Sequence, residues 1–218
     1  MNKHLEAADG YAGEYDKAGK ERSWHGPEII FGLMYDFIAP GESLLDIGIG
    51  TGLDAVIFKK AGLQVYGIDG SKEMLKICRD KQVAVELKQL DFLKDDIPYA
   101  DDFFIHAIAN AVFHITGEIE KTLGEVKRLL RKQGIFGFTI HEQDPGMESD
   151  YQETDTKGRY MKIREPYGFP VYKHSDQFVR SLLERYDFDL LKKTRYEAFT
   201  AYEDNPSYTL SLYISRKV

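Results

Sequence analysis

Three glycines stand within five positions of this chain, in the stretch LLDIGIGTGLDA at 44–55. Gly48, Gly50 and Gly52 come directly after a short aliphatic run of strand length, and Asp46 lies within that run. Glycines at such a turn let the backbone approach a ligand closely or take a positive φ, which a Cβ opposes. The loop after the first strand is also the usual ligand loop of a doubly wound sheet. The glycine run is therefore a candidate binding loop.

A second acid lies 17 residues after the last glycine. Asp69 ends the apolar run QVYGID at 64–69, where a carboxylate can accept hydrogen bonds from both hydroxyls of a ribose. Thr51 and Asp54 match the T-x-x-D pattern that caps the start of a helix. The glycine loop and Asp69, at the end of the next strand, together predict a ligand that contains a nucleoside.

The spacing of the glycines narrows the choice of nucleoside. The dinucleotide fingerprint G-x-G-x-x-G/A, started at Gly48, requires a small residue where this chain has Leu53. The loop carries no lysine and no G-K-[ST], so it is not the phosphate loop of a nucleoside triphosphatase. The pattern favours a cofactor without a pyrophosphate.

Segments typical of strands alternate with segments typical of helices through the first two thirds of the chain. The predicted strands cover 43–49, 64–69, 84–91, 103–109, 134–142, 189–199 and 207–218, and the predicted helices cover 27–40, 52–61, 71–81, 117–134 and 175–187. Such alternation is typical of a parallel sheet with helices on both faces. The loop at Asn205 and Pro206 is too short for a crossover helix, so the last two strands are expected to pair antiparallel. We predict an α/β fold: a doubly wound, seven-stranded sheet, mostly parallel, with a C-terminal antiparallel hairpin.

Composition sets the broad class of protein. The 218 residues are 43% apolar and 30% charged, with a net charge of −7 and one cysteine. No apolar stretch approaches the ~20 residues that a membrane span needs. The densest basic run, at 127–132, lies at the end of a predicted helix, where cations complement the helix dipole. We therefore expect one domain over 1–218, a cytoplasmic location, and no nucleic-acid or membrane partner.

From about residue 40 onward the chain resembles the class I S-adenosylmethionine-dependent methyltransferases. LLDIGIGTG resembles the first motif of this family, VYGIDGS the second, QLDF the third, and IANAVFHI at 108–115 the stretch after the fourth strand. The resemblance implies S-adenosylmethionine as cofactor and no metal ion. It places the ribose on Asp69, the adenine on Asp91 and Phe92, and the methionine end near Ala109 and Asn110. The positions that it implies for cofactor binding are Asp46, Gly48, Ile49, Gly50, Thr51, Asp69, Gly70, Met74, Asp91, Phe92, Ala109 and Asn110. Met74 is equally well explained as a core residue of its helix.

Methyl transfer from a sulfonium depends mainly on positioning, because the leaving group is already activated. A general base matters only if the acceptor arrives protonated. His114 follows the fourth strand and His141 ends the fifth, both at the carboxyl edge of the sheet, so both are candidates for that role. His114 has an alternative role as a residue that fixes a loop. The other histidines, His4, His25 and His174, are expected on the surface or in loops.

Two segments outside the motifs are candidates for acceptor selection. The first is an N-terminal helical lid over 1–40, with Tyr11, Tyr15, Arg22 and Trp24 as acceptor contacts. The second is an insertion over 143–172, rich in tyrosine and without clear periodicity, which we interpret as a substrate lid. Aromatic walls suit a flat ring or a cationic amine, whereas Arg22 suits a carboxylate. The tyrosines can equally be the packing residues of the lid itself.

The sequence therefore predicts an enzyme, monomeric or homodimeric, that methylates a small molecule at oxygen or nitrogen. Two alternatives stay open. One is a regulatory module that binds S-adenosylmethionine without transferring the methyl group. The other is an NAD-dependent oxidoreductase, which Leu53 and the terminal hairpin disfavour.

Overall fold

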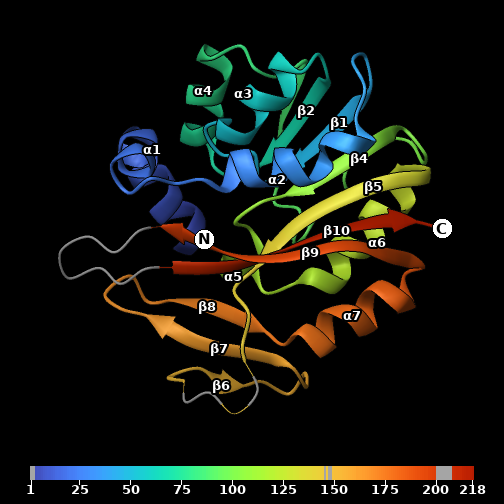
Figure 1. Cartoon of the computed structure of the whole chain (residues 1–218). Coiled ribbons are helices and arrows are strands. Elements are labelled where there is room, and N and C mark those ends of the chain that lie inside the picture. The colour runs from blue at the N-terminus through green and yellow to red at the C-terminus, as the bar shows by residue number, and fades with distance from the viewer. Residues whose placement is uncertain (1–2, 145, 147–148, 200–207) are drawn as a thin grey trace.

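A computed structural model of the chain describes residues 3–144, 146, 149–199 and 208–218. A seven-stranded sheet runs through these ranges in the order β3-β2-β1-β4-β5-β10-β9 (Figure 1). Its strands are β1 (Ser43–Ile47), β2 (Gln64–Asp69), β3 (Glu86–Gln89), β4 (Phe104–Ala109), β5 (Leu130–Ile140), β9 (Phe188–Phe199) and β10 (Tyr208–Lys217). The first five strands are parallel, and β10 pairs antiparallel with both β5 and β9. The predicted doubly wound sheet with its closing hairpin is confirmed.

Helices cover both faces of this sheet because its strands alternate apolar side chains between the two faces. Leu44 and Leu212 pack with one group of helices, and their neighbours Leu45 and Tyr213 pack with the other. The first group is α2 (Gly26–Met34), α3 (Leu53–Lys60) and α4 (Lys72–Asp80); the second is α5 (Phe113–Thr116), α6 (Ile119–Leu129) and α7 (Asp176–Arg185).

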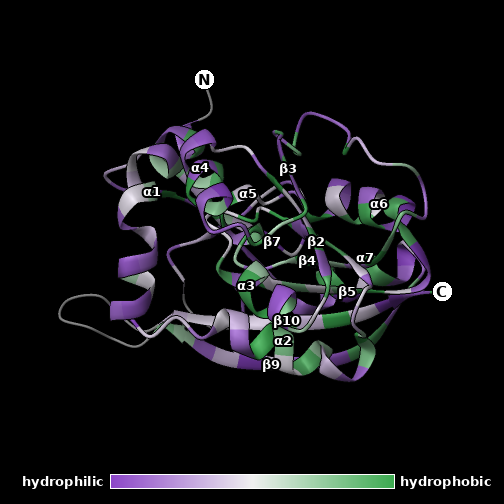
Figure 2. Ribbon diagram, turned by 90° about the horizontal axis from the view of Figure 1, so that it is seen from above, coloured by the Kyte–Doolittle hydropathy of each residue, from purple (hydrophilic) through white to green (hydrophobic). Residues whose placement is uncertain are grey.

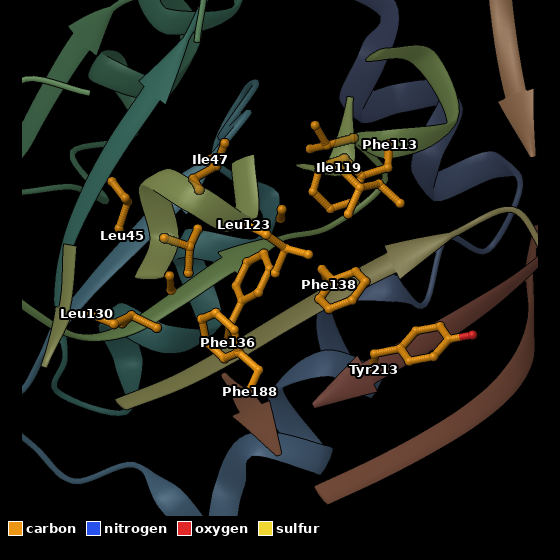
Figure 3. Packing of buried hydrophobic residues seen from close by; sticks show 14 of the residues in the cluster. Leu45, Ile47, Phe113, Ile119, Leu123, Leu130, Phe136, Phe138, Phe188 and Tyr213 are labelled. Atoms are coloured by element: carbon orange, nitrogen blue, oxygen red, sulfur yellow. The ribbon is translucent and has the colours of Figure 1, made fainter. Parts of the chain in front are cut away.

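Aromatic rings form the centre of the second layer. Phe136 stacks on Phe138 with ring centroids 4.9 Å apart, and Phe138 stacks on Tyr213 at 5.3 Å (Figure 3). Leu123 of α6 packs in the same buried cluster. This core fixes the β5 and β10 strands against each other, and so fixes the edge of the sheet where β5 ends.

Two helices end earlier than the sequence predicts. The helix expected over 27–40 ends at Met34 and continues as a short 3₁₀ turn, η1 (Tyr35–Phe37). The helix expected over 117–134 ends at Leu129, because Leu130 is extended and pairs with Phe104 at the start of β5. Strand pairing therefore overrides the helical pattern of this segment.

The insertion forms a small sheet of its own, which the sequence pattern did not reveal. Strands β6 (Gln152–Glu153), β7 (Arg159–Arg164) and β8 (Phe169–His174) pair antiparallel, and they lie below the main sheet in Figure 1. The end of β8 returns to the end of β5, where His174 N–H donates to the carbonyl of His141 over 3.0 Å. The expectation that His174 lies at the surface or in a loop is wrong: it ends β8, is buried, and a ring nitrogen lies 3.2 Å from the carbonyl of Gly117.

Helix α1 (Lys3–Glu21) precedes the sheet and packs against α4. It is largely hydrophilic and lies to one side of the sheet when the molecule is seen from above (Figure 2). Ala12 is its one buried residue. Among the described residues, we find no helix with the length and apolar character that crossing a membrane requires.

Candidate cofactor and acceptor site

The glycine loop lies between β1 and α3, and its three glycines have φ of 72°, 54° and 84°. A Cβ on Gly48 would lie 2.7 Å from Val112 Cγ2, and one on Gly52 would lie 2.8 Å from Cys78 Sγ. A Cβ on Gly50 would meet only the carbonyl oxygen of Gly48, at 3.9 Å, and the Gly50 N–H donates to Asp69. The expected positive φ of the loop glycines is confirmed, and at two of them the surrounding packing also excludes a side chain.

The capping role predicted for Thr51 and Asp54 is wrong. Helix α3 begins after Gly52, whose position as N-cap involves no side-chain hydrogen bond. The hydroxyl of Thr51 instead donates to Asp16 Oδ1 over 2.5 Å, and Asp54 Oδ1 accepts from Asn110 Nδ2 over 2.8 Å. Thr51 therefore does not cap the helix, and Asp54 lies in its first turn with its carboxylate bound to Asn110.

Asp69 lies where the sequence predicts it, at the end of β2. Its two carboxylate oxygens accept from Gly50 N–H and from Ser71 N–H, each over 2.8 Å. Burial raises the pKa of Asp69, and these backbone donors oppose that rise. Asp69 therefore ties the glycine loop to the turn after β2.

Three carboxyl groups surround the loop: Asp46 is buried, and Asp54 and Asp69 are half-buried. Asp46 Oδ2 is buried and has no hydrogen-bond partner among the described residues. Burial, and then the charges of Asp54 and Asp69, raise the pKa of Asp46 well above its usual range. Burial likewise raises the pKa of Asp54 to about 6. Buried carboxylates are costly unless a cation lies beside them, so this loop fits a ligand with positive charges. S-adenosylmethionine carries two, on its sulfonium and on its ammonium group.

The end of β4 connects this acidic loop to the fifth strand. Asn110 donates to Asp54, and Thr139 Oγ1 in turn donates to Asn110 Oδ1 over 3.1 Å. Ala111 has a φ of 55° and donates its N–H to Thr139 Oγ1 over 2.7 Å. Ala109, the last residue of β4, is buried. Thr139, the one hydroxyl of β5, has no motif around it that marks it as part of the site.

The positions predicted for the adenine lie at the ends of β2 and β3. Met74 is buried in α4, which agrees with either of its interpretations. Asp91 pairs with Lys94 Nζ over 2.6 Å, and Phe92 packs at the border of the core. A Cβ on Gly70 would lie 2.6 Å from Leu5 Cδ2, so the α1 helix covers the turn after β2.

Of the four residues predicted to contact the acceptor, two lie on α1. Burial raises the pKa of Tyr15, as do the neighbouring charges of Asp54 and Asp69, so its phenol lies beside the acidic loop. Tyr11 is 46% exposed and meets the Tyr15 ring edge-on at 6.0 Å. The structure brings Tyr15 to the loop and leaves Tyr11 exposed.

The other two residues, Arg22 and Trp24, meet Phe199 at the end of β9. Trp24 stacks on Phe199 with ring centroids 4.8 Å apart, and the Arg22 guanidinium lies 4.7 Å from the centre of the same ring. Phe199 lies 6.4 Å from the ring of Tyr208 at the start of β10. Tyr208 in turn contacts both candidate histidines, so Arg22 and Trp24 lie near them through Phe199 and Tyr208.

His114, His141, Tyr151 and Tyr208 form what we call the aromatic–histidine cluster. The ring of His141 lies 4.5 Å from that of Tyr208 and 5.9 Å from that of Tyr151, and His114 lies 5.9 Å from Tyr208. The structure thus brings together two histidines that are 27 positions apart in the sequence. Tyr208, the ring between them, was missed because its place depends on the closing hairpin.

Both imidazoles of the cluster are neutral at pH 7. Burial and then the charge of Arg164 lower the pKa of His114 to about 4. Burial and then the charge of Lys173 lower the pKa of His141 to about 3. An imidazole with so low a pKa accepts a proton weakly, so the surroundings of both rings oppose a general-base role.

Comparison with known proteins agrees with this architecture. Residues 45–138 match the family model described as a methyltransferase domain. An uncharacterized protein of Methanocaldococcus jannaschii is 30% identical over 157 residues, which cover 71% of this chain and 70% of that protein. A phosphatidylethanolamine N-methyltransferase of Cereibacter sphaeroides is 33% identical over 109 residues, 47% of this chain and 52% of the relative.

Solved structures share the fold at low sequence identity. A chain in the complex of the Haloferax volcanii Trm112 methyltransferase activator with a methyltransferase superimposes with a TM-score of 0.74 at 18% identity, covering 95% of this chain and 96% of that one. The 1,6-didemethyltoxoflavin-N1-methyltransferase of Burkholderia thailandensis gives 0.71 at 15% identity, covering 99% and 88%. The chain belongs to the class I S-adenosylmethionine-dependent methyltransferases, and its cofactor is S-adenosylmethionine.

Proposed function

We propose that this methyltransferase acts on a small molecule, at an oxygen or a nitrogen atom. The observation that carries the proposal is the aromatic–histidine cluster, which adjoins the acidic loop. Asn110 and Thr139 connect the two, because Asn110 donates to Asp54 and accepts from Thr139. His114 follows Asn110 by four positions in the chain, and His141 follows Thr139 by two. Buried rings with few polar groups are typical of small-molecule sites.

The cofactor lies, in this proposal, along the carboxyl ends of β1, β2 and β3. Asp69 accepts from the ribose hydroxyls, and the buried carboxylate of Asp46 faces the cationic end. The remaining proposed contacts come from the glycine loop, from the turns after β2 and β3, and from the end of β4: Gly48, Ile49, Gly50, Thr51, Gly70, Met74, Asp91, Phe92, Ala109 and Asn110. When bound, S-adenosylmethionine supplies an electrophilic methyl group on a good leaving group.

The residues of this chain then orient the acceptor and exclude water. Helix α1 and the β6–β8 sheet act as lids in this proposal, since α1 reaches the glycine loop through Asp16 and β8 packs on α5. His114 and His141 shape the acceptor site, and Tyr15 adds a phenol beside the acidic loop. A cytoplasmic location and a monomeric or homodimeric state belong to the same proposal.

Calorimetric titration with S-adenosylmethionine, S-adenosylhomocysteine and NAD tests the cofactor site. We expect the first two to bind with micromolar affinity and NAD not to bind. The Asp69→Ala variant is expected to lose this binding while its thermal unfolding stays cooperative. Asp80→Ala, which removes an exposed acid at the end of α4, is the matched control and is expected to bind normally.

Transfer of a radioactive methyl group to members of a small-molecule panel tests whether the protein methylates a small molecule. Labelled product from any member supports the proposal. Cofactor binding with no transfer to any member, or transfer only to a protein, overturns it in favour of a regulatory module or a protein methyltransferase.

A further inference from the structure

The aromatic–histidine cluster contains two buried nitrogens without partners. Nδ1 of His114 and Nδ1 of His141 are both buried, and neither has a hydrogen-bond partner in the described part of the chain. A buried polar atom without a partner is costly, and in native structures it calls for an explanation such as a ligand. Polar substituents of an acceptor would satisfy these atoms.

Four cations surround the same cluster. Lys162 Nζ lies 4.7 Å and Lys173 Nζ 4.6 Å from the centre of the Tyr151 ring. Arg164 lies 5.5 Å from the centre of the Tyr167 ring and, after burial, its charge lowers the pKa of His114. Arg195 donates to Asp144 and, again after burial, also lowers the pKa of His141. These cations come from β7, β8 and β9, so they approach the cluster from the insertion and from the closing hairpin.

Two carboxylates neutralise only part of this charge. Asp150 pairs with Lys162 over 2.6 Å, and Asp144 accepts from Arg195 over 2.7 and 2.8 Å. Within the described ranges, neither Lys173 nor Arg164 has a carboxylate within 4.0 Å. Among the described residues, cations therefore outnumber carboxylates around the cluster, in a protein whose net charge is −7.

Two of the aromatic rings near the cluster, Tyr151 and Phe199, already have cations of the protein over them. Lys162 and Lys173 lie over Tyr151, and Arg22 lies over Phe199, on which Trp24 also stacks. A ligand ammonium would have to displace a cation of the protein from each of these rings. It would also meet the repulsion of Lys173 and Arg164, whereas an anion would be attracted.

Building on the small-molecule function proposed above, we propose that the acceptor is a planar organic acid. Its ring packs against Tyr208, and its anionic group faces Lys173, which lies over Tyr151, and Arg164. His114 and His141, both neutral, form hydrogen bonds with the polar substituents of its ring. The arrangement selects acids over amides of the same shape and rejects amines.

Matched trios of ligands test this selection. Benzoate, benzamide and benzylamine form one trio, and 2-naphthoate, 2-naphthamide and 2-naphthylmethylamine form another. Each is titrated calorimetrically into the protein saturated with S-adenosylhomocysteine. We expect the acids to bind about tenfold more tightly than the amides, as one charge-assisted hydrogen bond provides, and the amines not to bind.

Variants locate the site of selection. Lys173→Met and Arg164→Met are each expected to weaken acid binding about tenfold, while the affinities for the amides and for S-adenosylhomocysteine stay unchanged. Lys132→Met removes an exposed cation at the opposite end of β5 and is expected to change nothing. Unchanged cofactor affinity also shows that each variant is folded.

The outcomes separate this inference from the proposed function. Failure to bind S-adenosylhomocysteine contradicts the cofactor site itself. Cofactor binding with no acid bound, with acids no tighter than amides, or with amines preferred overturns the planar-acid proposal. Acid binding that Lys173→Met and Arg164→Met leave intact also overturns it, because the acid then binds elsewhere.

Discussion

The hydroxyl of Thr51 donates to Asp16 Oδ1 over 2.5 Å and so joins helix α1 to the glycine loop. A second acid of the helix, Asp9, accepts from Ser71 Oγ over 2.5 Å at the turn after β2. Because α1 buries only Ala12, its position depends on such polar contacts more than on apolar packing. The helix is thus attached directly to the two turns that flank the proposed ribose position.

Removing the Thr51–Asp16 contact is expected to loosen α1. Asp16→Ala and Thr51→Val should each speed hydrogen exchange of the helix amides, and the double variant should add little to either. We expect a coupling energy of about 1 kcal/mol, typical of one side-chain hydrogen bond. Glu14→Ala, on the same helix and exposed, is the control. Fully additive effects of the two substitutions would show that the contact does not hold the helix.

The Gly48→Ala variant is expected to unfold more easily than the wild type, because its Cβ would lie 2.7 Å from Val112 Cγ2 at a φ of 72°. Adding Val112→Ala relieves the clash but not the backbone strain, so we expect partial recovery of the thermal midpoint. Gly10→Ala is the control: its helical site has nothing within 4 Å, and alanine there should stabilise by about 0.5–1 kcal/mol. Full recovery in the double variant would mean that the positive φ carries no cost.

Binding of S-adenosylmethionine is expected to weaken as the pH falls through about 6, where Asp54 takes up a proton. The charged carboxylate favours a cationic ligand, so the affinity is highest above that pH and the protein releases protons on binding near it. Titration in buffers of different ionisation enthalpy measures this release. S-adenosylhomocysteine lacks the sulfonium charge and is expected to show a smaller effect. Asp54→Asn should flatten the profile, and an unchanged profile would contradict the role of this carboxyl.

The two cluster histidines are expected to make the free protein acid-sensitive. Their folded-state pKa values, about 4 and about 3, lie below the ordinary value of 6.5. The stability that they contribute is therefore complete above pH 6.5 and is lost as the pH falls toward those values. His141→Gln should lose about 1–2 kcal/mol less than the wild type between pH 7 and 4, measured by denaturant unfolding. His25→Gln, at an exposed site, should follow the wild type.

Local patterns were enough to predict most of the main sheet. Alternating strand and helix segments, with glycines at the turns, located the strands to within a few residues, and the short loop at Asn205 predicted the hairpin. The positive φ of the loop glycines also followed from residue type. Each of these features depends on interactions between residues close in the sequence.

The features that were missed depend on distant partners. Thr51 and Asp54 match a helix cap, but Asp16 and Asn110, 35 and 56 positions away, engage them instead. His174 is buried because β8 returns to the end of β5. No local pattern in 143–172 predicts this return. Tyr208 joins the histidines only once the hairpin has formed. Contacts between residues far apart in the sequence set these positions, and a single sequence does not reveal which distant residues meet.

The insertion leaves and rejoins the main fold at a single point. His174 N–H donates to the carbonyl of His141, and Gln143 N–H donates to the carbonyl of His174, both over 3.0 Å. A segment whose two ends are neighbours can be exchanged for one of another length without changing the register of β5 or β10. Evolution or a protein engineer can therefore graft a new β6–β8 module here and alter acceptor preference while the cofactor half of the enzyme stays as it is.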